Sequence, residues 1–247
     1  MLIAEIGFNH LGKYKIADQY LDVLLQSNVD AITFQIREPL HRKKKPYRYF
    51  DDDKYQHLFK RIKDCNKKVS IALASPEYIS FFEELNVDFY KVIRNDITNE
   101  NLLRMLIETK KKIYVSTGMS SEEDIDMFSK FVGTRREQFS LIHTQLSNNI
   151  EDCNLKSIQA MKKHGMNVGY GNHCPDENTI FMALCCEPSD IFIYVKGDKD
   201  ADYPDKHHAI SISKFSFLIN KINDYERALG SGTKETMNNK IESLKER

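Results

Sequence analysis

The chain has 247 residues, and its 36 Lys and Arg balance its 36 Asp and Glu, so the formal net charge is zero. A neutral chain has no overall field to attract nucleic acid or an anionic membrane, and we expect neither partner. No apolar run approaches the ~20 residues of a membrane span, and the first residues resemble no secretion signal, which predicts a cytoplasmic protein. Five cysteines without C-x-x-C spacing indicate reduced thiols rather than a disulfide frame or zinc site.

Short runs rich in β-formers alternate with segments of helical periodicity along the whole chain. Most runs are continuously apolar, which is typical of parallel strands covered on both faces. Ser120 and Glu123 have the spacing of a capping box at the start of one helix. The pattern predicts a single-domain α/β protein, a (β/α)₈ TIM barrel, with a doubly wound open sheet as the poorer alternative. The expected strands are LIAEIG from 2, AITFQI from 31, VSIALA from 69, FYKVI from 89, KIYVSTG from 112, FSLIHTQ from 139, NVGYGNH from 167 and DIFIYV from 190.

Functional groups of such barrels lie at the carboxyl ends of the strands and in the loops that follow them. The stretch VGYGNHCPD, residues 168–176, ends an apolar run at His173 and therefore places this histidine at the expected active rim. A loop histidine hydrogen-bonded to backbone is the competing interpretation. The other rim segments are 5–10, 35–38, 75–77, 91–96, 116–119, 143–147 and 196–208.

Two rim segments have unusual charge. Residues 38–53, EPLHRKKKPYRYFDDD, are predicted either to form a basic flap over a phosphate or carboxylate, or to be a solvated loop whose three Asp cap the next helix. Residues 196–211, KGDKDADYPDKHHAIS, carry Asp at alternating positions. A calcium loop needs a glycine and a distal glutamate that are out of place here, so that signal is weak.

Taken together, the strand ends resemble the sialic acid synthase (N-acetylneuraminate synthase, NeuB-like) family. The resemblance rests on IAEIGFNHLG from 3, YKVIRNDITNENLL from 90, VSTGMSSEEDI from 115, VGYGNHCPD from 168 and YPDKHHAIS from 203. It implies a NeuB-like barrel over residues 1–232. ALGSGTK from 228 is similar to the point where family members continue into a small antifreeze-like domain. We expect that domain to be absent here and residues 233–247 to form a helical tail.

The resemblance implies condensation of phosphoenolpyruvate with an aldose, assisted by a divalent metal that polarises the aldehyde. It assigns Asp96, His173 and Lys91 to catalysis, with His173 as a metal ligand. Its partners would be a small sugar and phosphoenolpyruvate or a related anion, and a homo-oligomer is left open. Arg37 and Arg94 are expected to bind substrate in place of a second-strand lysine that the family carries and this chain lacks. The resemblance places further substrate-binding groups at Glu5, Asn9, Gln35, Ser116, Thr117, His143, Asn172, Lys196, Asp205 and His208.

The chain departs from the family pattern at the metal site. The family's second strand carries Lys-Phe-Gln, whereas this chain has Thr33 at the position of the lysine. The eighth strand of the family ends Glu-Lys-His-Phe, and the aligned residues here put Ile193 and Val195 in place of the acid and the second histidine ligand. A single histidine makes a poor site, so bound Mn or Mg is expected to be weak or absent.

Three functional hypotheses remain open from the sequence. The first is a divergent sugar-acid synthase of the phosphoenolpyruvate-condensing type. The second is a metal-free aldolase or lyase acting on a sugar phosphate or sugar acid, in which Lys91 or Lys196 forms a Schiff base. The third is a non-catalytic sugar-phosphate binding protein. Metal content separates the first from the others, and borohydride trapping separates the second from the third.

Overall fold

The structure is a computed structural model that describes residues 1–93 and 97–234, and in these residues nine strands form one sheet. The first eight are parallel and follow one another in chain order, and β1 also pairs with β8, which closes the sheet into a barrel. The predicted (β/α)₈ barrel is therefore confirmed. The strands are β1 Leu2–Gly7, β2 Ala31–Ile36, β3 Lys68–Leu73, β4 Phe89–Val92, β5 Lys112–Ser116, β6 Phe139–His143, β7 Asn167–Gly171, β8 Ile191–Lys196 and the short β9 Ile210–Ser211.

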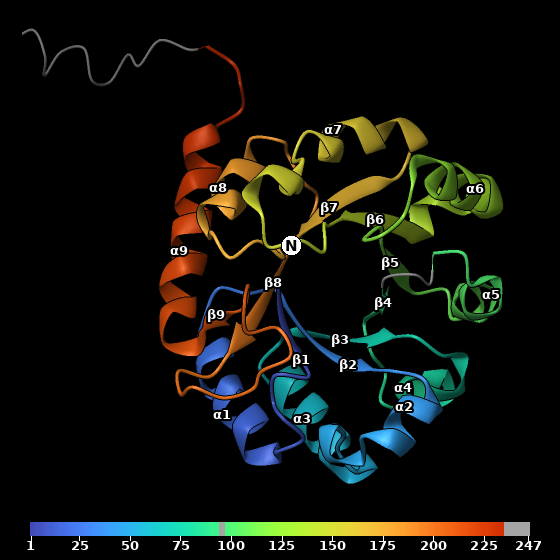
Figure 1. Ribbon diagram of the computed structural model, residues 1–247, viewed down its shortest axis with the longest axis vertical. Coiled ribbons are helices and arrows are strands. Elements are labelled where there is room, and N and C mark those ends of the chain that lie inside the picture. The colour runs from blue at the N-terminus through green and yellow to red at the C-terminus, as the bar shows by residue number, and fades with distance from the viewer. Residues whose placement is uncertain (94–96, 235–247) are drawn as a thin grey trace, which may run out of the picture.

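Helices form a ring around the strands (Figure 1). The α-helices are α1 Tyr14–Leu24, α2 Pro39–Lys44, α3 Asp52–Asp64, α4 Ile79–Glu84, α5 Glu100–Glu108, α6 Glu122–Val132, α7 Ser157–Met161, α8 Asn178–Leu184 and α9 Ile212–Leu229. Five 3₁₀ turns join them within the described ranges: η1 Pro46–Arg48, η2 Pro76–Tyr78, η3 Gly133–Gln138, η4 Ile150–Cys153 and η5 Lys162–His164.

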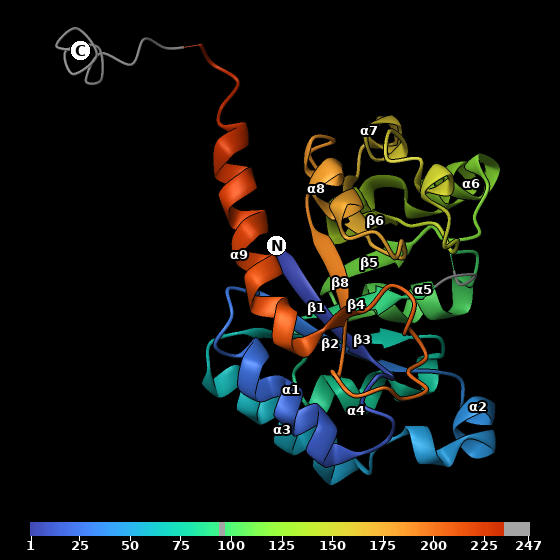
Figure 2. The same cartoon turned by 60° about the vertical axis from the view of Figure 1, so that its left-hand side comes forward.

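The helices are held to the barrel by apolar stripes that the sequence encodes at helical spacing. In α3 the buried residues are Tyr55, Leu58, Phe59 and Ile62, which recur every three or four positions and so share one face. Burying each such side chain contributes roughly 1.5–3 kcal/mol. α9 packs against both α1 and α8 beside β8, so the last helix of the barrel contacts the first (Figure 2).

The capping box of α6 lies one residue after the predicted position. Ser121, not Ser120, adopts the extended cap conformation, and its hydroxyl accepts a hydrogen bond from the backbone N–H of Asp124, whose carboxylate accepts one from the backbone N–H of Ser121 in return. Ser120 instead donates its backbone N–H to the carbonyl of Thr117 in the turn before the helix. Both registers satisfy the sequence pattern, and the turn after β5 selects the later one.

The barrel interior changes from apolar to polar along its axis. Its lower layer is apolar and is formed by Ile3, Ala31, Phe89, Tyr114, Ile142 and Phe192. Because side chains alternate along a strand, residues two positions further along β1, β4, β5 and β8 face the same interior at the carboxyl ends. These residues are Glu5, Lys91, Ser116 and Tyr194. The fold therefore presents a polar mouth above an apolar plug.

The part of the chain that the structure describes contains no helix long and apolar enough to cross a membrane. Of the predicted helical tail, residues 235–247 lie outside the described ranges.

Candidate functional site

A cavity of about 370 Å³ opens at the carboxyl ends of the barrel strands, within the size range of small-molecule sites. Charged and polar side chains from several strand ends converge on it. It is lined by Phe8, Gln35, Arg37, His41, Arg48, Lys91, Ile93, Ser116, Leu146, Ser147, Asn148, His173, Pro204, Asp205, His207 and His208. The barrel thus brings together seven of the predicted site residues, namely Gln35, Arg37, Lys91, Ser116, His173, Asp205 and His208.

The floor of the cavity contains a buried ion pair. The ammonium of Lys91 on β4 contacts the carboxylate of Glu5 on β1, and the two side chains are only 7% and 2% exposed. The same ammonium lies 4.9 Å from the ring centroid of Phe192 and 5.6 Å from that of Tyr194, so the aromatic faces of β8 also stabilise its charge. The β1–β2 pairing shifts register immediately after Glu5, a local bulge of the kind that re-aims side chains beside active sites.

The wall of the cavity is formed by the loop after β8. Asp205 lies above the floor pair; burial raises the pKa of its carboxyl group to about 7, and the nearby carboxylate of Glu5 adds to the rise. Burial lowers the pKa of His208 to about 4. The Nε2 atom of His208 is 3.8 Å from Oδ1 of Asp205. Near neutral pH, His208 is therefore a neutral imidazole, and Asp205 carries its proton for much of the time, as a general acid must.

His173, at the end of β7, belongs to an aromatic group in this wall. Its ring lies 4.2 Å from that of His208 and meets Tyr194 edge-on at 5.4 Å. Gly7 makes room for this group, because a Cβ atom there would lie 3.1 Å from the Tyr194 ring and 3.5 Å from Oδ2 of Asp205. The φ angle of Gly7 is +52°, a value that also favours glycine.

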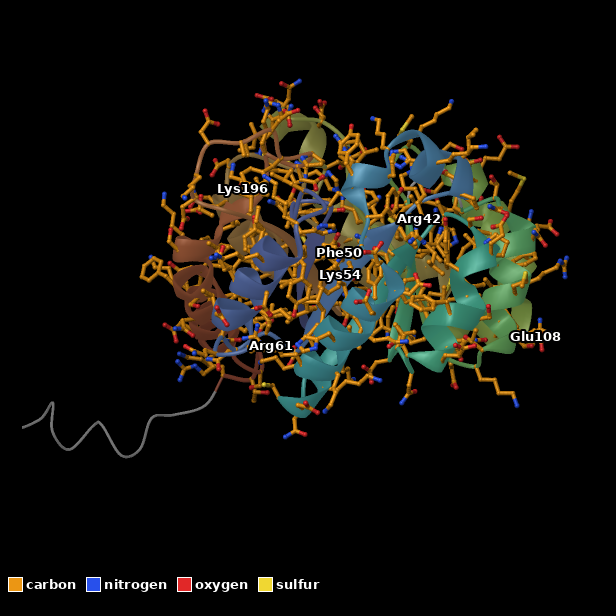
Figure 3. The ribbon with its side chains drawn as sticks, turned by 90° about the horizontal axis from the view of Figure 1, so that it is seen from below. Arg42, Phe50, Lys54, Arg61, Glu108 and Lys196 are labelled. Carbon is orange, nitrogen blue, oxygen red and sulfur yellow. The ribbon has the colours of Figure 1, made fainter. Side chains whose placement is uncertain are left out.

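The predicted basic segment lies at the mouth of the cavity, and Asp51 precedes α3 without forming the side-chain cap that the solvated-loop interpretation expected. Residues 39–48 form α2 and η1 at the mouth, where His41 and Arg48 line the cavity, and Asp51 precedes α3. The segment is fastened at its C-terminal end: Arg42 donates to the carbonyl of Phe50 at 3.1 Å, and Phe50 is buried (Figure 3). The segment is therefore a packed part of the rim in this structure.

The two-histidine metal site that the resemblance implies does not fit these residues. The expectation that Val195 and Ile193 occupy the positions of the missing ligand and acid is wrong, because both side chains face outward into the core beneath the helices. The inward position beside His173 is Tyr194. Among the described residues, the one group of three ligand atoms within 4.8 Å of one another is Glu122, Asp126 and His164, in α6 and η5 on the helical layer.

Five predicted site residues do not line the cavity and instead hold its walls. The side chain of Asn9 bridges the carbonyl of Val195, at 2.8 Å, and the backbone N–H of Asp205, at 3.2 Å. The other four are likewise bound to the protein: Thr117 donates to the carbonyl of Ile142, His143 donates through Nε2 to the carbonyl of Cys153, Asn172 accepts from Tyr170, Cys174 and Thr179, and Lys196 donates to the carbonyl of Lys206.

Two predicted residues, Arg94 and Asp96, lie outside the described ranges. The structure also adds two cavity residues that the sequence did not indicate, His41 and Arg48, and it places the ring of Tyr194 against the cavity residue His173. Strict alternation along β8 from the interior residue Phe192 would have identified Tyr194. His41 and Arg48 were within the basic segment, but no spacing rule separates them from its solvent-facing lysines.

A family model decides the relationship of the chain. The model described as the NeuB family matches residues 19–234. The chain belongs to the NeuB family.

Individual relatives agree with this family. The chain is 26% identical to the N,N'-diacetyllegionaminic acid synthase of Campylobacter jejuni, covering 95% of this chain and 79% of that protein. It is 24% identical to a pseudaminic acid synthase from Campylobacter jejuni, covering 94% and 75%. Among solved structures, the N-acetylneuraminic acid synthetase of Leptospira borgpetersenii, in complex with citrate, superposes with a TM-score of 0.88 at 22% identity, covering 100% of this chain and 90% of that one.

Proposed function

We infer that this NeuB-family protein is a sugar-acid synthase that condenses phosphoenolpyruvate with an aldose. The observation that carries the proposal is the buried Lys91–Glu5 pair at the floor of the mouth, because a cation enclosed by protein is suited to bind a small anion. The names of the relatives, which are synthases of legionaminic and pseudaminic acids, support the same class of reaction.

The reaction would proceed as follows. C3 of phosphoenolpyruvate forms a bond to the aldehyde carbon of the open-chain sugar, and the aldehyde oxygen takes up a proton. Water adds to C2, and inorganic phosphate leaves as the bond from C2 to the bridging oxygen breaks, so the product is a 2-keto-3-deoxy sugar acid. Phosphoenolpyruvate, aldose and water thus give one sugar acid and one phosphate.

The described residues supply the groups that this reaction needs. Lys91 holds the anion, and the hydroxyl of Ser116, which also lines the cavity, is a further hydrogen-bond donor for it. The protonated carboxyl group of Asp205 donates to the aldehyde oxygen, with neutral His208 beside it to re-protonate the carboxylate from water. No step is assigned to a metal, because the ligand set implied by the family does not fit this mouth.

The Schiff-base alternative is disfavoured by the contact between Lys91 and Glu5. The Lys91 nitrogen is already engaged by the Glu5 carboxylate in a buried ion pair, whereas a Schiff base requires a nitrogen that is free to attack a carbonyl carbon. Lys196 donates its amine hydrogens to a backbone carbonyl outside the cavity lining.

The test is phosphate release from phosphoenolpyruvate in the presence of a panel of aldoses, with the product identified by mass. Asp205→Asn should lower kcat by at least ~10²-fold, since general acid catalysis contributes about 10²–10⁴-fold. Asp202→Asn on the same loop is a matched control, because the side chain of Asp202 is 93% exposed. The parent rate should fall as pH rises through about 7, where Asp205 loses its proton. Absence of aldose-dependent phosphate release with every sugar would leave a binding protein as the function.

A further inference from the structure

The mouth contains a second cationic position, on the rim rather than the floor. Arg48 ends η1, is half-buried and lines the cavity together with Arg37 and His41 from the same segment. All three follow β2, whereas Lys91 projects from β4 at the floor. The cavity therefore has cationic side chains at two levels, of which the floor cation is paired with Glu5.

Arg48 differs from the other arginines at this mouth in its partners. Arg37 forms an ion pair with Glu38 at 3.1 Å, and Arg42 is bound to Phe50 and Asp52. Within residues 1–93 and 97–234, the guanidinium of Arg48 has neither a hydrogen bond nor an ion pair. Its charge acts on Asp205, whose pKa it lowers against the effect of burial. An arginine that lines a cavity with its donors unused is available to a ligand.

The backbone that carries Arg48 is seated on the first βα loop. A Cβ atom on Gly12 would lie 1.7 Å from the carbonyl oxygen of Tyr47 and 3.3 Å from Cα of Arg48, so only glycine permits this contact. The next two residues are buried: Tyr49 packs edge-on against Phe8 at 5.2 Å, and Phe50 lies 4.1 Å from the ring of His10. The position of Arg48 is thus fixed before any ligand binds, which lowers the entropic cost of binding.

We propose that Arg48, with Arg37 and His41, binds a phosphate group on the aldose, so that the acceptor substrate of this protein is a phosphorylated sugar. This inference deepens the proposed function and rests on it for the identity of the other substrate. The floor cation Lys91 takes phosphoenolpyruvate, and the rim cations take the far end of the sugar. The planar guanidinium of Arg48 offers two parallel N–H donors that match two phosphate oxygens.

Binding of an unreactive sugar tests the proposal without catalysis. N-acetylmannosaminitol 6-phosphate has the open-chain form but no aldehyde, so it cannot condense, and N-acetylmannosaminitol is its matched partner without phosphate. Calorimetry on the full chain saturated with phosphoenolpyruvate should show at least ~10-fold tighter binding of the phosphorylated alditol. Arg48→Gln should remove most of this preference and Arg48→Lys should restore part of it. Lys44→Gln, on the exposed face of α2, should leave it unchanged.

Three outcomes would overturn the proposal: equal affinity for the two alditols, a phosphate preference that survives Arg48→Gln, or an equal loss of preference in Lys44→Gln. Unchanged binding of phosphoenolpyruvate by Arg48→Gln would show that the variant retains its fold and its floor site. Failure of the proposed function gives a different result, because aldose-dependent phosphate release would then be absent while the alditol preference still depended on Arg48.

Discussion

Replacing Lys91 with Met should destabilise the protein strongly, even though methionine has a similar length. The change removes the ammonium group but leaves the carboxylate of Glu5, which is 2% exposed, in the barrel interior above the Phe192 ring. Breaking a buried ion pair by removing one partner typically costs about 3–5 kcal/mol, because the remaining charge is uncompensated. We expect a loss of that size in the free energy of unfolding at pH 7.5.

The second partner shows whether the loss comes from the orphaned charge. Glu5→Gln alone leaves the Lys91 cation without its carboxylate and should also destabilise the chain. The double variant Glu5→Gln, Lys91→Met has no buried charge at this position, and replacing both members of a buried pair is often close to neutral. The double variant should therefore be within about 2 kcal/mol of the parent, which corresponds to a coupling energy of several kcal/mol.

Urea unfolding followed by far-ultraviolet circular dichroism gives the four free energies of the cycle, provided that the slopes agree. Lys43→Met is a suitable control, since Lys43 is exposed on α2. A loss below about 1 kcal/mol in Lys91→Met, or a double variant as unstable as the sum of the two single changes, would refute the assignment of a buried, mutually dependent pair. Either result would indicate that water reaches the Lys91–Glu5 pair more readily than the exposed fractions of the two side chains suggest.

Three further predictions concern neighbouring features. Burial lowers the pKa of His10 to about 3 from 6.5, so between pH 7.5 and 5 only the unfolded chain takes up a proton at this residue, and the free energy of unfolding decreases as the pH is lowered. In His10→Asn, whose side-chain oxygen can still accept from the backbone N–H of Gly12, this decrease should be smaller by about 2 kcal/mol. Gly12→Ala should lower the free energy of unfolding, measured with urea, by at least about 2 kcal/mol and should reproduce the binding defect of Arg48→Gln. The control Gly133→Ala, at φ +58° with open space around it, should lose only about 1–2 kcal/mol from backbone strain. Equal losses in the two variants would contradict the contact between Gly12 and η1. Tyr194→His should bind Mn at least ~10-fold more tightly than the parent in calorimetry, and adding His173→Ala should abolish this gain. Val195→His should show no gain, because Val195 faces the outer core. The reverse result would show that the inward face of β8 is misassigned.

The sequence predicted the barrel well because its signal is local. Each apolar run became a parallel strand, and the first residue of each observed strand differs from the predicted start by at most one position. The register of individual side chains was less accessible. Val195 was expected at the mouth, but alternation along β8 places Tyr194 there, and the capping box of α6 shifted by one residue from Ser120 to Ser121. A shift of one residue changes the face of a strand while leaving the apolar pattern intact.

Partners that are distant in the chain could not be predicted in this way. Lys91 was selected as a pocket cation, but its pairing with Glu5, 86 residues earlier, depends on the order of the strands around the barrel. The resemblance placed Asn9, His143 and Asn172 in the site, and the structure shows their side chains bonded to neighbouring loops instead. The placement of Arg48 at the mouth depends on the close contact between Gly12 and the backbone of Tyr47, which no local pattern predicts.

The closure of β1 on β8 has a consequence for how the protein is made. Asn9 and its partner Val195 are 186 residues apart, and Glu5 lies opposite Tyr194 in the same seam. During synthesis this seam cannot form until nearly the whole chain has left the ribosome, and contacts of such long range fold slowly and leave sheet edges exposed meanwhile. The mouth needs both ends of the chain, because Phe8 follows the first strand and Pro204, Asp205, His207 and His208 belong to the loop after β8. Ligand binding should therefore appear last during refolding, after the helix content has recovered. The rate at which binding activity appears should then report the rate at which β1 pairs with β8.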